Sequence, residues 1–187
     1  MIPVVETARL TLRGRTVADF PAFAAMWADA RVTRFIGGAP IAEEDAWAKF
    51  ARMEGFWRLT GCGFWIVEER ATGAVIGELG LADFRRAIDP PLGRIPEFGW
   101  AFASTAQGKG YATEALGAAL AWGDEKFPGS VFPCIIDEEN TPSVRLAEKH
   151  GFKRVGPATY KGAAVSIFRR PAPASHSPSV TMRPLRS

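Results

Sequence analysis

The spacing of the apolar residues changes several times along this chain, and the order of those changes constrains the fold more than any other feature. Residues 9–13 (RLTLR) alternate polar and apolar side chains, which is the period of a half-buried strand. Apolar residues then recur at helical spacing in two segments, one after Thr16 and one from about Ile41 to Gly61. The N-terminal third is therefore predicted to hold one strand followed by two helices.

The rest of the chain alternates strand-like and helix-like segments. The predicted elements are strands at 64–67 and 74–81 joined by a turn at 70–73, a strand at 94–102, a helix at 111–126, a strand at 131–136, a helix at 141–150, and closing strands at 152–155 and 164–169. The resulting order is β-α-α-β-β-β-α-β-α-β-β. This order predicts a mixed α/β (α+β-like) domain with a meander ahead of a βαβ crossover.

The domain organisation follows from length and from a shift in composition. The 187 residues suit one domain with a continuous core. From Pro171 onward the chain is rich in proline, serine, alanine and arginine and has few large apolar residues. Such a segment buries too little apolar surface to offset the entropy lost on ordering. We therefore expect a single domain over residues 1–170 and a flexible tail over residues 171–187.

The charge balance argues against a nucleic-acid-binding face. The chain has 23 Lys and Arg residues against 20 Asp and Glu residues, and Arg183 and Arg186 both lie in the acid-free tail. The first 170 residues therefore hold 21 basic and 20 acidic side chains. That balance is too even for a broad phosphate-binding surface.

Metal-binding, secreted and membrane-spanning proteins are also disfavoured. Cys62 and Cys134 have no CxxC partners, and two histidines do not complete a zinc set, so we expect buried reduced thiols and no metal site. No basic leader with a long apolar run opens the chain, and no run of about 18 apolar residues occurs in it. We expect a cytoplasmic protein that does not bind membranes.

The segment most informative about chemistry joins the strand at 94–102 to the helix at 111–126. It reads Gln107-Gly108-Lys109-Gly110-Tyr111-Ala112-Thr113-Glu114. Small residues let a ligand approach the backbone, and the following helix N-terminus offers free N–H groups, which together suit a phosphate or pyrophosphate. The segment is neither a Walker loop nor a complete Rossmann fingerprint, because no GxxxxGK[ST] occurs and Thr113 replaces the third glycine. Taken alone, it is equally consistent with a tight turn leading into a helix.

Four motifs in order give the chain a resemblance to a known family. Gln107-x-x-Gly110-x-Ala112 resembles the acyl-coenzyme A pyrophosphate motif [QR]-x-x-G-x-[GA] of the GNAT N-acetyltransferase superfamily. The other three motifs are residues 9–13 (RLTLR), 97–100 (EFGW) and 140–152 (NTPSVRLAEKHGF). The match covers roughly residues 6–170 and is similar to the RimJ/RimL-like branch, which acetylates protein N-termini or small amines. It implies the GNAT fold, with a mixed, mostly antiparallel central sheet splayed between the fourth strand (94–102) and the fifth strand (131–136).

The resemblance also implies where acetyl-CoA, the co-substrate, binds. The backbone near Trp100 and Phe102 would hold the pantetheine arm, because a peptide-like arm can hydrogen-bond to an exposed strand edge. Asn140 would meet the cofactor near its thiol, or cap the helix that follows, or do both. Lys109 would add charge beside the phosphates, the alternative being a solvated loop lysine. The pyrophosphate would be held by the amides of Gln107, Gly108, Lys109, Gly110, Tyr111 and Ala112.

Two further residues match catalytic positions of the family. Glu97 matches a carboxylate often found on the cofactor-side strand and is the candidate general base, acting directly or through a water. The alternative for Glu97 is a surface glutamate on an edge strand. Ser143 is the candidate hydrogen-bond donor to the leaving thiol, and its alternative is a first-turn serine bonded to the backbone. The tyrosine that many GNAT enzymes carry in this helix is absent, because Ala147 stands at its position.

The implied reaction is direct attack of a neutral amine on the acetyl thioester in a ternary complex, and the chain has no GxSxG nucleophile elbow. At neutral pH, deprotonating a lysine amine with a pKa of about 10.4 costs roughly 4–5 kcal/mol, whereas an α-amine near 7.7–8.0 costs about 1 kcal/mol. A single glutamate base therefore favours an acceptor whose amine has a low pKa, which is either a protein N-terminal α-amine or a small-molecule amine. The expected partners are acetyl-CoA and that amine, with the protein a monomer or homodimer.

Two other functions remain as alternatives. The missing tyrosine at Ala147 is compatible with a non-catalytic acyl-CoA sensor or interaction domain. Nucleic-acid binding ranks third, because the near-neutral body offers few phosphate contacts. The acceptor itself is not identified by the sequence.

Overall fold

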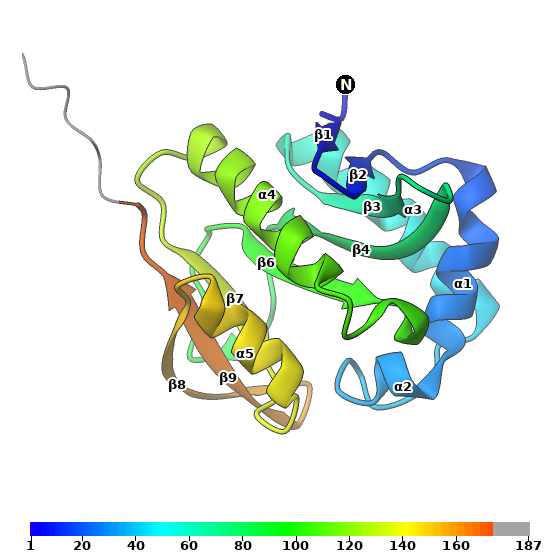
Figure 1. Ribbon diagram of the computed structural model, residues 1–187. Coiled ribbons are helices and arrows are strands. Elements are labelled where there is room, and N and C mark those ends of the chain that lie inside the picture. The colour runs from blue at the N-terminus through cyan, green and yellow to red at the C-terminus, as the bar shows by residue number, and fades with distance from the viewer. Residues whose placement is uncertain (174–187) are drawn as a thin grey trace, which may run out of the picture.

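The computed structural model describes residues 1–173, and Figure 1 shows how their elements are arranged. Within this range the chain forms nine strands and five α-helices, which is a mixed α/β fold. Residues 174–187 of the predicted tail lie outside the described residues.

The strands form two sheets in which all paired neighbours are antiparallel. The first sheet, in the order β1-β2-β3-β4-β6, consists of β1 (Val5–Glu6), β2 (Leu10–Arg13), β3 (Phe64–Glu69), β4 (Ala74–Ala82) and β6 (Glu97–Phe102). The second sheet, in the order β5-β8-β9-β7, consists of β5 (Ile88–Asp89), β8 (Lys153–Tyr160), β9 (Ala163–Arg170) and β7 (Phe132–Ile136).

The helices are distributed between the connections of these strands. They are α1 (Phe20–Ala28), α2 (Ala30–Thr33), α3 (Glu43–Thr60), α4 (Tyr111–Lys126) and α5 (Thr141–Lys149), with short 3-10 turns at Val17–Asp19 and Ser104–Ala106. None of the helices within residues 1–173 combines the length and apolarity needed to cross a membrane.

The two sheets meet at β6 and β7, which are neighbours but share no ladder of hydrogen bonds within the described residues. β6 is an edge strand of the first sheet, and β7 is an edge strand of the second. This arrangement confirms the splay predicted between the strands at 94–102 and 131–136. Because an edge strand presents unpaired backbone N–H and C=O groups, the splay exposes a row of polar groups along β6.

The side chains of β6 alternate between two different environments. Phe98 packs with Leu116 and Leu120 of α4 in the main core. Ala101 instead joins a second core with Phe23 of α1 and residues of α3. β6 therefore has one face toward α4 and α5 and the opposite face toward α1 and α3. Glu97 lies on the second face, because it is four residues before Ala101 in the same strand and side chains alternate between the faces.

Several elements differ from the prediction. The last two strands reach Lys153–Tyr160 and Ala163–Arg170, longer than expected, because they pair with each other around a tight turn. The two-residue strands β1 and β5 and the four-residue helix α2 are too short to show a hydrophobic period, so the sequence did not indicate them. Strand β6 begins only at Glu97, since residues 94–96 belong to the preceding loop.

The buried thiols were predicted correctly. Cys62 and Cys134 are both free, and each is only 1% exposed. Among the described residues, no group of three or more His, Cys, Asp or Glu side chains is placed to hold a metal ion.

Candidate functional site

A cradle of backbone N–H groups lies between the end of β6 and the start of α4. Gly108 and Gly110 have φ of +75° and +79°, a left-handed conformation that glycine adopts without steric cost. Within residues 1–173, no hydrogen bond engages the N–H groups of residues 108–113. Consecutive free amides at a helix N-terminus form a binding site for an anion such as a phosphate. The Gln107 N–H, which was also predicted to hold the anion, instead donates to the carbonyl oxygen of Ser104 at 3.4 Å. We call residues 107–113, with the free amides of residues 108–113, the cradle.

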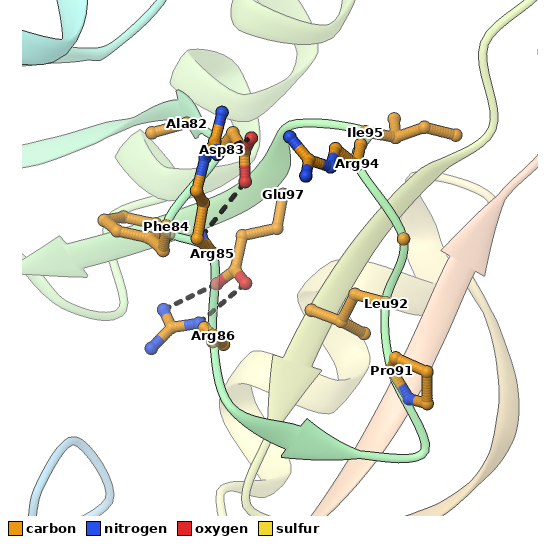
Figure 2. A pocket seen from close by; sticks show the side chains of 11 residues that line it. Ala82, Asp83, Phe84, Arg85, Arg86, Pro91, Leu92, Arg94, Ile95 and Glu97 are labelled. Atoms are coloured by element: carbon orange, nitrogen blue, oxygen red, sulfur yellow. Dashed lines mark hydrogen bonds and ion pairs between the residues drawn. The ribbon is translucent and has the colours of Figure 1, made fainter.

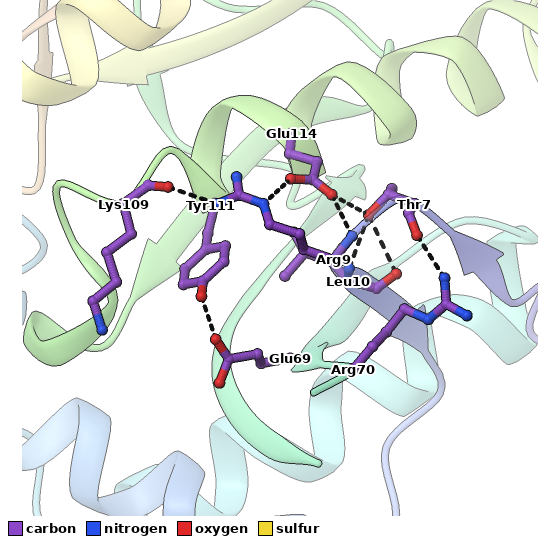
Figure 3. A network of polar contacts seen from close by, with 8 residues as sticks. All are labelled: Thr7, Arg9, Leu10, Glu69, Arg70, Lys109, Tyr111 and Glu114. Carbon is purple, nitrogen blue, oxygen red and sulfur yellow. Dashed lines mark hydrogen bonds and ion pairs between the residues drawn. The ribbon is translucent and has the colours of Figure 1, made fainter. Parts of the chain in front are cut away.

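Residues of the turn between β1 and β2 contact the cradle and the first turn of α4, as Figure 3 shows. Arg9 donates through Nη1 to the carbonyl oxygen of Lys109 at 2.9 Å and through Nε to Glu114 at 2.7 Å. Glu114 also accepts from the Thr7 hydroxyl at 2.6 Å and from the Arg9 backbone N–H at 2.8 Å. Partial burial raises the pKa of Glu114, but these hydrogen bonds outweigh it and lower the pKa below its ordinary value.

The bond from Arg9 orients the peptide group that links Lys109 to Gly110. In a trans peptide the C=O and the following N–H point in opposite directions. Because the Lys109 carbonyl faces Arg9, the Gly110 N–H is directed to the other side, where it remains available to a ligand. Arg9 thus positions the cradle without being part of it.

The side chains of the cradle have different surroundings. Tyr111 is buried beneath the Arg9 guanidinium, which lies 4.6 Å from the ring centroid, and its hydroxyl bonds to Glu69. The Gln107 amide donates to the carbonyl oxygen of Phe102 at 3.2 Å and so closes the end of β6. Lys109 is exposed and forms no ion pair among residues 1–173. These residues contribute mainly through their backbone.

A second group of predicted residues lies at the splay. The Trp100 indole N–H of β6 donates to the Ser143 hydroxyl of α5 at 3.2 Å. The Asn140 side chain accepts from the Ser143 backbone N–H at 3.3 Å, so the capping role predicted for Asn140 is confirmed. Because the Ser143 oxygen already accepts from Trp100, its own proton remains to be donated elsewhere.

Glu97 lies on the opposite face of β6 and is 4% exposed, so the interpretation as a surface glutamate is wrong. Its carboxylate forms two hydrogen bonds of 2.6 Å with Arg86. The Arg86 guanidinium lies 4.5 Å from the Phe84 ring and 4.7 Å from the Tyr160 ring. Burial raises the pKa of Glu97 above its ordinary value, although the bonds to Arg86 oppose the shift.

Glu97 borders a cavity of about 230 Å³ formed by the two loops between β4 and β6. Figure 2 shows the Glu97 side chain between Arg86 and the segment that carries Leu92 and Arg94. We call this space the Glu97 cavity. It lies on the face of the first sheet away from α4, so a ligand in it would meet β6 from the side opposite the cradle helix.

The structure therefore divides the predicted residues into two sets. The cradle, Trp100, Asn140 and Ser143 lie on the side of α4 and α5, and Glu97 lies on the other face of β6. Sequence reasoning missed two arginines that position these groups. Arg9 bonds to the backbone of the cradle, and Arg86 pairs with Glu97. Arg9 belongs to the RLTLR motif at residues 9–13, which could have drawn attention to it, whereas no motif or periodicity includes Arg86.

A family model described as an acetyltransferase (GNAT) domain matches residues 9–153. The N-acetyltransferase p20 of Bacillus licheniformis, itself uncharacterized, is 27% identical over 151 residues, which cover 80% of this chain and 82% of that protein. The uncharacterized protein YkkB of Bacillus subtilis (strain 168) is 34% identical over 91 residues, which cover 49% of this chain and 51% of that protein. The match therefore spans about half the length of YkkB.

Solved structures share the fold over nearly the whole described chain. A GNAT-family protein from Bordetella pertussis has a TM-score of 0.78 at 33% identity, covering 90% of this chain and 99% of that chain. RimL, a ribosomal L7/L12 alpha-N-protein acetyltransferase solved in complex with coenzyme A, has a TM-score of 0.75 at 14% identity, covering 92% of this chain and 100% of its own. At 14% identity the likeness to RimL extends to the fold alone.

Proposed function

This chain belongs to the GNAT acetyltransferase family, and from that membership we propose that it transfers the acetyl group of acetyl-CoA to an α-amine of a peptide or small molecule. The observation that carries the proposal is the cradle of unbonded N–H groups at the end of an unpaired strand edge. The motif order and the RimL fold support placing the chain in the RimJ/RimL-like branch. As in that branch, we expect the enzyme to act in the cytoplasm.

The residues of the cradle suit the pyrophosphate of coenzyme A. The six N–H groups of residues 108–113 have no partner within residues 1–173, and they lie at or just before the N-terminus of α4, where the helix dipole also favours negative charge. The edge of β6 near Trp100 and Phe102 offers its backbone groups to the amide bonds of pantetheine. The bound co-substrate supplies the activated acetyl thioester.

The remaining tasks fall to three groups of this chain. Glu97 removes the proton from the attacking ammonium, directly or through a water, and its raised pKa brings it closer to that of an α-amine. A backbone N–H near Phe102 polarises the thioester carbonyl. The Ser143 hydroxyl, held by Trp100, donates a hydrogen bond to the leaving sulphur.

The competing candidate is a domain that binds acyl-CoA without turnover. Two observations favour it: Ala147 stands where many GNAT enzymes carry a tyrosine, and Arg86 occupies both oxygens of Glu97. An acceptor screen over peptides and small amines separates the candidates, with mass spectrometry to detect acetylated product and calorimetry to measure acetyl-CoA binding. Acetylated product from α-amines supports the enzyme, whereas binding with no product from any acceptor favours the sensor.

A further inference from the structure

The Glu97 cavity is bordered by more positive than negative side chains. Three arginines line it, Arg85, Arg86 and Arg94, against two acids, Asp83 and Glu97. Both acids are already paired, Glu97 with Arg86 at 2.6 Å and Asp83 with Arg85 at 3.4 Å. Arg94 is exposed and has no acidic partner within 4.0 Å in the part of the chain that the structure describes. The lining of the cavity therefore contains both the proposed base and one guanidinium that has no acidic partner among the described residues.

The backbone conformation of the loop after β4 helps to hold Asp83 against Arg85. Arg85 has a φ of +49°, a left-handed conformation that is uncommon for a residue other than glycine. Its N–H donates to the Asp83 carboxylate at 3.0 Å, so the turn holds Asp83 against Arg85. Such conformations are often retained at binding sites, where the surroundings offset their cost. Here the turn keeps the Asp83 carboxylate paired with Arg85, so Asp83 does not neutralise Arg94.

Further positive charge lies on the same face of the first sheet. Arg15 and Lys49 flank Glu78, which pairs in register with Ala101 of β6. The Arg15 side chain is 3% exposed, and its Nε and Nη1 atoms have no partner in the described structure. Burial lowers the pKa of Lys49, and the nearby charges of Arg52, Arg15 and Arg86 lower it further, against the opposing effect of Glu78. When all three are ionised, Arg15, Lys49 and Glu78 carry one net positive charge on the face of the sheet that bears Glu97, although none of them lines the Glu97 cavity.

We propose that the acceptor carries a carboxylate close to its reacting amine, and that this carboxylate binds Arg94 while the amine meets Glu97. The inference rests on the proposed acetyl transfer and narrows its acceptor. A guanidinium suits a carboxylate because its N–H groups can form two parallel bonds to the two oxygens. Two sources supply this chemistry, a peptide with an acidic residue next to its N-terminus and a free acidic amino acid. The volume of about 230 Å³ suits one terminal residue of either source.

Matched acceptors test the charge directly. The peptides Ala-Glu-Ala-Ala and Ala-Gln-Ala-Ala differ only in one charge. The α-amides of glutamate and glutamine also differ only in one charge, because amidation removes the α-carboxylate that the two free amino acids share. With the wild-type protein we expect kcat/KM for the acidic member of a pair to exceed that for its neutral partner about tenfold, as for one charge-assisted hydrogen bond. The pair that shows the preference identifies the source, and the preference should shrink as salt concentration rises.

Arg94→Glu supplies the second arm, because an exposed residue without partners can be reversed in charge without loss of folding. We expect it to abolish or invert the ratio between acidic and neutral acceptors, with Arg94→Gln giving an intermediate ratio. Arg58→Glu is the matched control, since Arg58 is an exposed arginine of α3 that does not line the Glu97 cavity. The ratio in this control should equal that of the wild type.

Different failures have different meanings. Equal or faster turnover of the neutral acceptors, or a ratio unchanged in Arg94→Glu, overturns the anionic acceptor and leaves acetyl transfer to α-amines standing. Absence of product from every α-amine, in a protein that binds acetyl-CoA by calorimetry, overturns the proposed function together with this inference.

Discussion

Arg9 and Lys109 are joined by a hydrogen bond of 2.9 Å from a guanidinium N–H to a backbone carbonyl oxygen, although 100 residues separate them in the chain. The bond ties the first sheet to the loop at the N-terminus of α4, and Glu114 completes the link by binding the same guanidinium. It fixes the direction of the Gly110 N–H, so we expect the affinity for the co-substrate to depend on Arg9 even though Arg9 need not touch it.

Arg9→Gln should weaken coenzyme A binding while leaving the chemical step largely intact. Loss of one oriented amide corresponds to about a threefold to tenfold increase in Kd, as expected for a single hydrogen bond. Calorimetry with coenzyme A measures the change, and steady-state kinetics should show a raised KM for acetyl-CoA at nearly constant kcat. Arg70→Gln is the control, because Arg70 donates to the Thr7 carbonyl in the same network but does not contact the loop. Equal effects of both variants would assign Arg9 a general structural role.

Gly110→Ala should weaken coenzyme A binding by more than its loss of folding stability accounts for. Its φ of +79° strains any other residue, and an added Cβ would lie 3.4 Å from the Arg9 guanidinium. Gly129→Ala is a matched control, since Gly129 has a φ of +76° with nothing near its absent Cβ. Each variant should lose about 1–2 kcal/mol of unfolding free energy from backbone strain. Denaturant titration measures that loss, and only Gly110→Ala should also raise the Kd for coenzyme A.

Glu97→Gln should lower kcat by about a hundredfold or more, the usual size of a general-base contribution, with little change in acetyl-CoA affinity. The base must be deprotonated to act, so kcat/KM should fall as pH drops through the pKa of Glu97. Because burial raises that pKa, the acid limb should lie above the ordinary glutamate value of 4.5, and it should be absent in Glu97→Gln. An unchanged rate and an unchanged pH profile would remove Glu97 from the mechanism.

The contrast between Arg9 and Arg86 shows what could be predicted from the sequence. The alternation in residues 9–13 predicted a strand, and Leu10 and Leu12 are indeed buried there. The glycines of the cradle are local signals as well, because a turn into a helix needs only neighbouring residues. Arg86, by contrast, lies in a connection whose path depends on β5 pairing with β8, some 70 residues later in the chain. Such a long-range contact leaves no periodicity, so the ion pair that buries Glu97 was not visible in advance.

Ser143→Ala should reduce kcat while the KM for acetyl-CoA stays nearly constant, because the hydroxyl is proposed to bond the leaving sulphur only as it develops charge. A charge-assisted hydrogen bond of about 1.5–3 kcal/mol corresponds to a loss of about tenfold to a hundredfold. Trp100→Phe removes the indole N–H that orients this hydroxyl, together with part of the ring, but keeps the hydroxyl itself, so its effect on kcat should be smaller. Ser143→Thr keeps a hydroxyl and should recover part of the rate. A serine that served only α5 would lower stability in these variants without separating kcat from KM.

The buried pair of Arg15 and Glu78 should be costly to break and much less costly to remove entirely. Their side chains are 3% and 1% exposed, and the bond between them is 3.4 Å long. Glu78→Met leaves the charges of Arg15 and Lys49 without their shared counter-charge, which should lower the free energy of unfolding by about 3–5 kcal/mol. The double variant Arg15→Met with Glu78→Met replaces both charges by apolar side chains and leaves Lys49, whose side chain is 19% exposed, as the remaining cation of this group. It should be more stable than Glu78→Met alone. Urea denaturation of the wild type, Arg15→Met, Glu78→Met and the double variant gives the coupling energy of the pair. Arg31→Ala, which breaks the exposed pair with Asp29, is the control and should change stability little. Additive losses in the two single variants would show that the charges of Arg15 and Glu78 are not compensating each other.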